Sequence, residues 1–450
     1  MNHLVSSGVV PSNGLIFLKG PVEQNIYDDD MEYRLAPENT FYYTTGLVEQ
    51  DTFSLLDLEK KTTSLYVKFP EPMKTYWVNC KSKQSYEQDT GIEEIINFSE
   101  LKKDLEAKVC DRPLFLYSGI NPVSGIPTLS AEKLLLQELP TKQLDTSAIF
   151  APINRLRLVK SPEEIELLRQ ATKVAASAFE SAAAFATAGH TEAQVAAAFE
   201  TAAIFAANAE FADEPIVAGG QNATFLHHTP SGVTPLVSGQ PVLLDFACRL
   251  AGYAGVVART IPVGSAFTQT QRALFEAAAR IQKALLAACL PGTLFTNIEN
   301  ATRLEAINEL TGLGLLLPNQ LSETEKIELS FTFLPLPLAS FVGLYTQEPH
   351  DGLKVSGVEG LLISETLEEG MTLTAQIGIF FIPALLEKLK ESQKINNLIN
   401  WETIESFERE ATAIKFKDSF VISTSGAERF VDLPLSVDEL ENFVAKARKA

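Results

Sequence analysis

Residues 151–161 (APINRLRLVKS) separate two parts of the chain that have different patterns. Before them, short apolar runs and polar turns alternate with helical stretches, which predicts an α/β domain. After them, Ser161, Pro162 and Glu164 supply a hydroxyl cap, a first-turn proline and an acid, which together indicate the start of a helix. A chain of 450 residues can bury two cores. We therefore expect a first domain over 1–150, a linker over 151–165 and a second domain over 166–450.

The apolar runs of the first part predict strands, because each is short and bounded by polar residues. They lie at residues 15–18, 53–56, 63–69, 95–98 and 114–117. In the second part an alanine-rich helix runs to about residue 188, and Thr191 caps another that runs to about 208. Further helices are predicted near 268–289 and 295–310, followed by a strand-rich end and a last helix at 436–448.

Composition argues against several classes of partner. The formal charge is −20 and the pI is about 4.8, which disfavours binding to nucleic acid or to an anionic membrane. The N-terminus has no cationic segment followed by a long apolar one, so we expect no signal peptide. The cysteines Cys80, Cys110, Cys248 and Cys289 are scattered without metal-ligand spacing. Reduced thiols and a cytoplasmic location follow as expectations.

The stretch 243–264 (LLDFACRLAGYAGVVARTIPVG) carries the clearest motif. It resembles the strand-turn-strand of the creatinase/aminopeptidase P/prolidase family of Xaa-Pro metallopeptidases, in which L-x-D-x-G is followed, after seven variable residues, by S-D-x-T-R-T-F-P. Asp245 matches the first acid of that pattern. Val256 stands where the second acid is expected, while Arg259, Thr260 and Pro262 keep the register.

The resemblance extends over nearly the whole chain and is closest to the prolidase branch. Further segments that are similar to the family lie at 28–46, 55–77, 157–169 and 216–228. This implies an α/β creatinase-like N-terminal domain followed by an α+β pita-bread domain, in which two αββ halves are related by a pseudo-twofold axis. It also implies a site with five protein ligands for two Mn²⁺, Co²⁺ or Zn²⁺ ions, which share a hydroxide that attacks the peptide carbonyl.

Most of the implied ligand positions hold residues that bind such ions poorly. Residues 335–343 match the P-H-G-x-G-H-x-x-G pattern and place Ser340 at the ligand histidine. Residues 374–378 match T-V-E-P-G, and residues 415–418 match R-I-E-D. By this resemblance, Asp245 is kept and the other four ligands are replaced, by Val256, Ser340, Gln376 and Lys417. We expect no metal, no cofactor and no catalytic residue.

Other residues invite weaker hypotheses. His227 matches a substrate-facing histidine of the family, and His350 may be aligned with a second one by a three-residue insertion; both are candidates for residual peptide binding. The alternatives are inherited structure without function for His227 and a mobile surface loop for His350. A lone buried carboxylate is energetically costly, and a nearby cation would offset that cost, so one hypothesis is that Asp245 pairs with Lys417. The alternative is that both side chains reach solvent. Ser340, His227 and Asp245 also have the residue types of a hydrolytic triad, but no nucleophile elbow surrounds Ser340.

The sequence therefore predicts a catalytically inactive pseudopeptidase that works by binding a peptide or protein. The resemblance implies a homodimer, or a heterodimer with an active paralogue. Residues 363–367 (ISETL) contain none of the substrate-facing arginines that the family has there. The alternative is a metal-dependent Xaa-Pro aminopeptidase or dipeptidase with an unconventional site. A structural or storage role is a third hypothesis.

Overall fold

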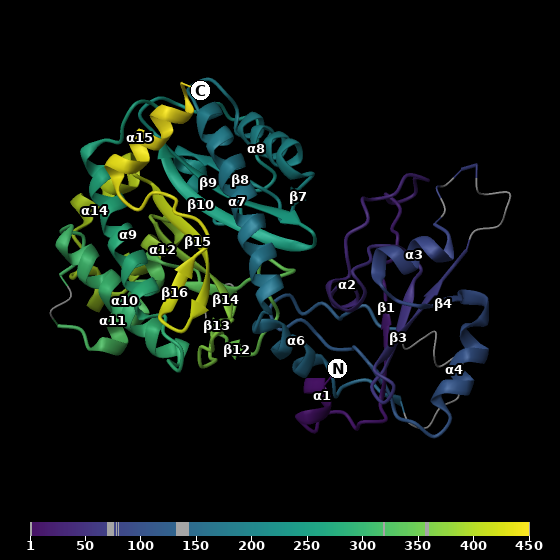
Figure 1. Ribbon diagram of the computed structural model, residues 1–450. Helices are drawn as coiled ribbons and strands as arrows, with labels where there is room; N and C mark the ends of the chain where they lie inside the picture. Colours follow the sequence, from purple (N-terminus) through teal and green to yellow (C-terminus); the bar gives the residue numbers. More distant parts are fainter. Residues whose placement is uncertain are drawn as a thin grey trace. The chain divides into compact units, whose positions relative to one another are not determined.

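The computed structural model describes residues 2–69, 76–77, 79, 81–131, 144–317, 320–355 and 360–449. The chain forms two compact units, Met1–Leu156 and Arg157–Ala450 (Figure 1). The segment 151–165, expected as a linker, contains most of helix α6 (Phe150–Leu158) and the start of helix α7 (Pro162–Phe185). The boundary between the units thus falls inside a helix.

The first unit is built on a mixed sheet with strand order β4-β3-β2-β1-β5-β6. Its strands confirm the five predicted ones to within two residues and are β1 (Leu15–Lys19), β2 (Phe53–Asp57), β3 (Thr62–Val67), β4 (Glu94–Asn97), β5 (Leu114–Leu116) and β6 (Leu144–Asp145). The helices are α1 (Asn2–Ser6), α2 (Asn39–Thr45), α3 (Lys83–Thr90) and α4 (Leu101–Val109). Ile16 and Leu18 enter one hydrophobic cluster and Leu15 and Phe17 another, so both faces of β1 are buried.

Asp57, at the end of β2, forms a bidentate ion pair with Arg112. The guanidinium Nη1 and Nη2 atoms lie 2.8 Å and 2.6 Å from the two carboxylate oxygens. Hydrogen bonds from Arg112 outweigh burial and lower the pKa of Asp57 to about 2. Because the folded-state pKa is below the unfolded one, the pair stabilises the fold above the unfolded pKa, and this contribution is lost as the pH falls through about 2.

We expect Asp57→Asn to lower the free energy of unfolding by about 2 kcal/mol at pH 7, and the difference from wild type to vanish as the pH approaches 2. Urea unfolding, followed by circular dichroism at several pH values, measures this difference in the free energy of unfolding. Asp51→Asn is the control, because the Asp51 side chain is 56% exposed and its ion pair with Lys68 is long, at 3.9 Å. Equal effects of the two substitutions at pH 7 would contradict the assignment.

The second unit is built on an antiparallel sheet with strand order β11-β14-β15-β10-β9-β7, to which β16 and β8 add at β15 and β9. Its strands are β7 (Glu210–Phe211), β8 (Ile216–Gly219), β9 (Pro241–Leu250), β10 (Tyr253–Pro262), β11 (Ala339–Phe341), β14 (Thr372–Phe380), β15 (Ala413–Ser423) and β16 (Gly426–Arg429). A separate short pair joins β12 (Gly352–Leu353) to β13 (Leu362–Ile363). The motif of residues 243–264 forms the β9–β10 hairpin.

The helices of this unit, besides α7, are α8 (Glu192–Ala207), α9 (Gln269–Ala288), α10 (Phe295–Gly312), α11 (Glu323–Phe333), α12 (Pro383–Glu391), α13 (Gln393–Asn396), α14 (Trp401–Glu410) and α15 (Val437–Ala447). The caps predicted at Ser161 and Thr191 are confirmed, and each forms a capping box. The expectation of a strand-rich end is wrong in part, because α11, α12 and α14 lie there. Helix α14 is amphipathic: Trp401, Ile404 and Phe407 are three residues apart and pack on the core.

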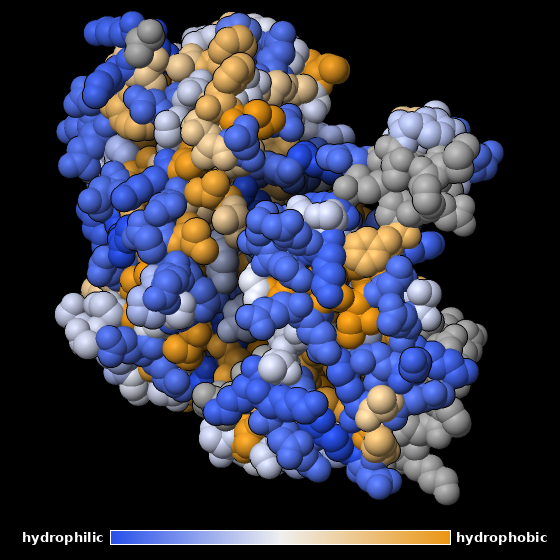
Figure 2. Space-filling view, turned by 45° about the vertical axis from the view of Figure 1, so that its right-hand side comes forward, coloured by the Kyte–Doolittle hydropathy of each residue, from blue (hydrophilic) through white to orange (hydrophobic). Residues whose placement is uncertain are grey.

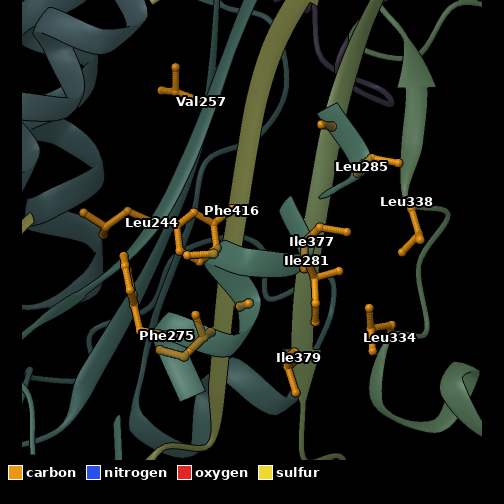
Figure 3. Close-up of a cluster of buried hydrophobic side chains, with 14 of the residues drawn as sticks. Leu244, Val257, Phe275, Ile281, Leu285, Leu334, Leu338, Ile377, Ile379 and Phe416 are labelled. Atoms are coloured by element: carbon orange, nitrogen blue, oxygen red, sulfur yellow. The ribbon is translucent and has the colours of Figure 1, made fainter. Parts of the chain in front are cut away.

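Helices α7 and α9 pack against one face of the sheet, α7 on β9 and β10 and α9 on β14 and β15. These are the two αββ halves expected of a pita-bread fold. Figure 3 shows side chains of this face beside those of α9; the strand residues are Leu244, Val257, Ile377 and Phe416, and the helix residues are Phe275, Ile281 and Leu285. At Gly255 the contact with α7 is so close that a Cβ atom would lie 2.2 Å from the carbonyl carbon of Ala171.

No helix within the described parts of the chain combines the length and the hydrophobicity needed to span a bilayer. On the face of the molecule that Figure 2 shows, hydrophilic residues predominate and apolar residues are interspersed between them. Cys110, Cys248 and Cys289 are free thiols, and Cys80 lies outside the described residues.

Candidate functional site

The register of the sheet brings the family's metal-ligand positions to one face. Side chains alternate along a strand, so the neighbours of the residues packed on α7 and α9 lie on the opposite face. Asp245 pairs with Ala258, Ala258 with Lys417, and Lys417 with Gln376, which forms a row across four strands. The next row holds Ser340, opposite Thr374, and Thr374 lies opposite Ser419. Val256 lies in this row, since its carbonyl accepts from Ser419 Oγ at 3.0 Å.

Two lysines surround the single carboxylate of the site. Asp245 Oδ2 lies 2.5 Å from Lys415 Nζ, and Asp245 Oδ1 lies 3.6 Å from Lys417 Nζ. The three side chains are only 8%, 6% and 9% exposed. The predicted pairing of Asp245 with Lys417 is confirmed. Lys415 was not predicted as a partner, although it is the closer of the two.

These charges control the titration of the site. Burial on its own raises the pKa of Asp245, but the two ammonium groups outweigh it and hold the pKa below its usual value. Burial lowers the pKa of Lys415, and Lys417 adds to this, while Asp245 offsets part of the shift. The carboxylate is therefore ionised and already neutralised by the protein itself.

The remaining positions make neutral contacts. Val256 is fully buried and has no side-chain donor or acceptor. Ser340 Oγ lies 2.8 Å from Thr374 Oγ1, and Thr374 Oγ1 also donates to the carbonyl of Ser340 at 3.4 Å. Gln376 Nε2 donates to the carbonyl of Pro337 at 2.9 Å. None of these groups carries the negative charge that a hard divalent cation prefers.

The donor set does not fit a two-metal centre. Such a centre needs several carboxylates able to bridge two ions, whereas this face offers one carboxylate held by two ammonium groups. In the part of the chain that the structure describes, no three His, Cys, Asp or Glu side chains come together as a metal-binding group. A cation placed at Asp245 would meet the repulsion of Lys415 and Lys417.

The retained motif residues serve the opposite face. Arg259 Nη2 lies 2.7 Å from Asp418 Oδ1, and both side chains are almost completely buried. Gln282 of α9 donates to the other oxygen of Asp418 at 2.9 Å. Arg259 and Asp418, which match the family pattern, thus join β10, β15 and α9, whereas the replaced positions lie on the face of Asp245.

The predicted histidines make contacts of their own. His227 is exposed, and its Nδ1 lies 3.2 Å from Thr229 Oγ1. His350 Nδ1 lies 3.1 Å from the carbonyl of Glu348, and its ring packs edge-on against Phe341 at 5.3 Å. With Ser340 bonded to Thr374, the hydrogen bonds of a Ser340, His227 and Asp245 triad are not formed among the described residues.

A polar cluster that the sequence did not reveal joins α8 to the segment after β8. Glu192 is fully buried, and its Oε2 lies 2.9 Å from His228 Nε2. Its Oε1 accepts from Gly219 N at 2.9 Å and from Asn222 Nδ2 at 2.8 Å. The only signal in the sequence was an acid at the first position of a helix, which is ordinary there.

Comparison with known proteins agrees with this architecture. The model of metallopeptidase family M24 matches residues 166–424, more than half of the chain. The chain belongs to metallopeptidase family M24. The model of the aminopeptidase P N-terminal domain matches residues 1–115 of this M24 protein. The resemblance to Xaa-Pro peptidases and the two-part fold class are thereby confirmed.

Relatives of this M24 protein are similar over its full length. The Xaa-Pro dipeptidases of Rattus norvegicus and Homo sapiens are each 22% identical and align with 100% of this chain and 92% of their own. Among solved structures, aminopeptidase PepP of Pseudomonas aeruginosa superimposes with a TM-score of 0.82 at 21% identity, covering 100% of this chain and 97% of that one. Aminopeptidase P from E. coli gives a TM-score of 0.77. At such identities the structures establish the fold alone.

Proposed function

We propose that this protein is a noncatalytic member of family M24 that binds a peptide or protein instead of hydrolysing it. One observation carries the proposal: Lys415 and Lys417 neutralise Asp245 at the place where the family resemblance puts two metal ions. A site of net positive charge neither attracts divalent ions nor lowers the pKa of a water molecule between them. Val256, Ser340 and Gln376 add no charge that would reverse this.

The names of the relatives favour the second candidate, a metal-dependent Xaa-Pro peptidase. Similarity over the full length of Xaa-Pro dipeptidases supports that activity most directly. For this candidate to hold, carboxylates or imidazoles outside the matched positions must provide the ligands. The contacts of Asp245 weigh against it, because this candidate requires both ammonium groups to move away first.

Cytoplasmic location and assembly are further parts of the proposal. The family resemblance supports a homodimer, or a heterodimer in which an active paralogue supplies catalysis and this chain the second subunit. Co-expression of the two paralogues followed by size-exclusion chromatography tests the heterodimer. Separate elution at micromolar concentration would exclude it.

The deciding experiment measures metal and turnover on one sample. Purified protein is incubated with excess Mn²⁺ and desalted, the bound metal is measured by elemental analysis, and hydrolysis of Xaa-Pro dipeptides is assayed. We expect fewer than about 0.1 equivalents of metal and no turnover, because the site repels cations. The Xaa-Pro dipeptidase of Homo sapiens, treated identically, is the positive control for dipeptide hydrolysis. About two equivalents with turnover would overturn the proposal and establish the peptidase.

A further inference from the structure

The site on the second sheet carries one positive charge more than it can neutralise. Asp245 faces both Lys415 and Lys417, and among the described residues it is the only acid within ion-pair distance of either. Lys415 takes the close contact, at 2.5 Å. Lys417 lies 3.6 Å from the carboxylate, which is an ion pair but longer than a hydrogen bond. An ammonium group this buried is costly unless a partner satisfies it.

Lys417 therefore has unused hydrogen-bond donors. Its side chain is 9% exposed, and within the described residues the one acid near its three N–H donors is Asp245, whose Oδ1 atom lies 3.6 Å from Nζ. Gln376 is directly opposite on β14, so the two Cβ atoms are about 4.5–5.5 Å apart. The amide of Gln376 gives one N–H to Pro337 and retains a second. The two side chains thus have N–H donors left over beside one another, next to the Asp245 carboxylate and the Oε1 atom of Gln376.

The neighbouring groups limit what can bind. Ala258 and Val256 are apolar, and the hydroxyls of Ser340 and Thr374 are bonded to each other. The excess of one positive charge matches a monoanion; a phosphate group, with a charge of about −1.5 to −2, would exceed it and be repelled by Asp245. Lys417 and Gln376 are both almost completely buried, so a ligand meets them through a small area of exposed surface.

We propose that this face of the sheet is a carboxylate-binding site, in which Lys417 and Gln376 hold the anion and Lys415 holds Asp245 away from it. The inference rests on the proposed function, because a metal centre would occupy the same side chains. The carboxylate belongs either to a small free acid or to the end of a peptide. Both sources present the same two acceptor oxygens to the ammonium and amide donors.

Isothermal titration at constant ionic strength tests the site with acetate, inorganic phosphate, and the dipeptide Ala-Pro with a free or an amidated C-terminus. We expect Lys417→Gln to weaken carboxylate binding by at least about tenfold, the usual worth of a hydrogen bond to a charged group. Asp245→Asn is expected to tighten it by a similar factor, because it removes the competing anion. Lys283→Gln, an exposed lysine of α9, is the matched control and should leave binding unchanged.

The outcomes distinguish a small free acid from the end of a peptide as the ligand, and they test the carboxylate site separately from the noncatalytic function. Acetate binding as tightly as the free dipeptide indicates a free acid, and binding of the free dipeptide alone indicates a peptide end. No carboxylate binding, tighter binding of phosphate, or equal binding by Lys417→Gln and Lys283→Gln would overturn the inference. If Asp245→Asn does not fold, the two lysine variants decide. Bound metal in the experiment under Proposed function would overturn both the noncatalytic function and the carboxylate site. A protein that binds neither metal nor carboxylates would overturn only the carboxylate site.

Discussion

Divalent metal binding is expected to appear when the four replaced positions are changed together to the family's ligands, by V256D, S340H, Q376E and K417E. The register places all four on the same face as Asp245, so the new donors would converge there. The change also converts a site of net positive charge into one of net negative charge. Lys415 stays, because it matches the basic residue of the R-I-E-D pattern.

Elemental analysis after incubation with Mn²⁺ and desalting measures this gain, and circular dichroism checks that the variant folds. We expect between about one and two equivalents bound by the quadruple variant, against fewer than about 0.1 for wild type. The triple variant V256D, S340H, Q376E is the matched control. It retains the ammonium group of Lys417, whose repulsion of a unit charge is about 4 kcal/mol at 4 Å and an effective dielectric of 20. A folded quadruple variant without metal would show that the ligand positions have been matched wrongly.

Loss of Lys415 is expected to destabilise the second unit more than loss of Lys417. Lys415→Met removes the ammonium group that lies 2.5 Å from Asp245 and leaves a poorly neutralised buried carboxylate. We expect the free energy of unfolding to fall by about 3 kcal/mol, the low end for breaking a buried pair, because Lys417 still lies nearby. Lys417→Met removes only the longer contact together with a buried ammonium group that is itself costly, so the free energy of unfolding is expected to change by about 1 kcal/mol or less.

Urea unfolding at pH 7 compares these variants. The combined variant Asp245→Leu, Lys415→Met, Lys417→Met is the control, because replacing an entire buried ion cluster by apolar residues is usually neutral or stabilising. The folded-state pKa of Asp245 lies below its unfolded value. The contribution of the cluster is therefore present above the unfolded pKa and is lost as the pH falls through the folded one. Equal losses for Lys415→Met and Lys417→Met would contradict the geometry.

The sequence predicted the elements whose signal is local. Short apolar runs bounded by turns marked the strands of the first unit, because a strand buried on both faces is apolar throughout, as in β1. Capping boxes marked the starts of α7 and α8. Helix α14 was missed although Trp401, Ile404 and Phe407 recur every three residues, which is a helical pattern that was available in the sequence.

Contacts in the candidate site were predictable where both residues lie on one strand or in matched family motifs. The proximity of Asp245 and Lys417 followed from the matched motifs, and in the structure Asp245 Oδ1 lies 3.6 Å from Lys417 Nζ. Lys415 could have been found too, since residues two apart on a strand share a face. The contact of Glu192 with His228 could not, because it joins residues 36 positions apart through a turn that no local pattern specifies.

In the central strands of the second sheet, alternate residues point to opposite faces and have different roles. On one side, Arg259, Asp418 and Gly255 contact the helices or the neighbouring strand, and on the other, Asp245 and Lys417 form an ion pair. The residues that pack on the helices and the residues of the candidate site are therefore separate sets of positions. A substitution on the face of Asp245 thus leaves the residues that pack on α7 and α9 unchanged. The same independence makes this sheet a scaffold on which new sites can be built without redesigning its core.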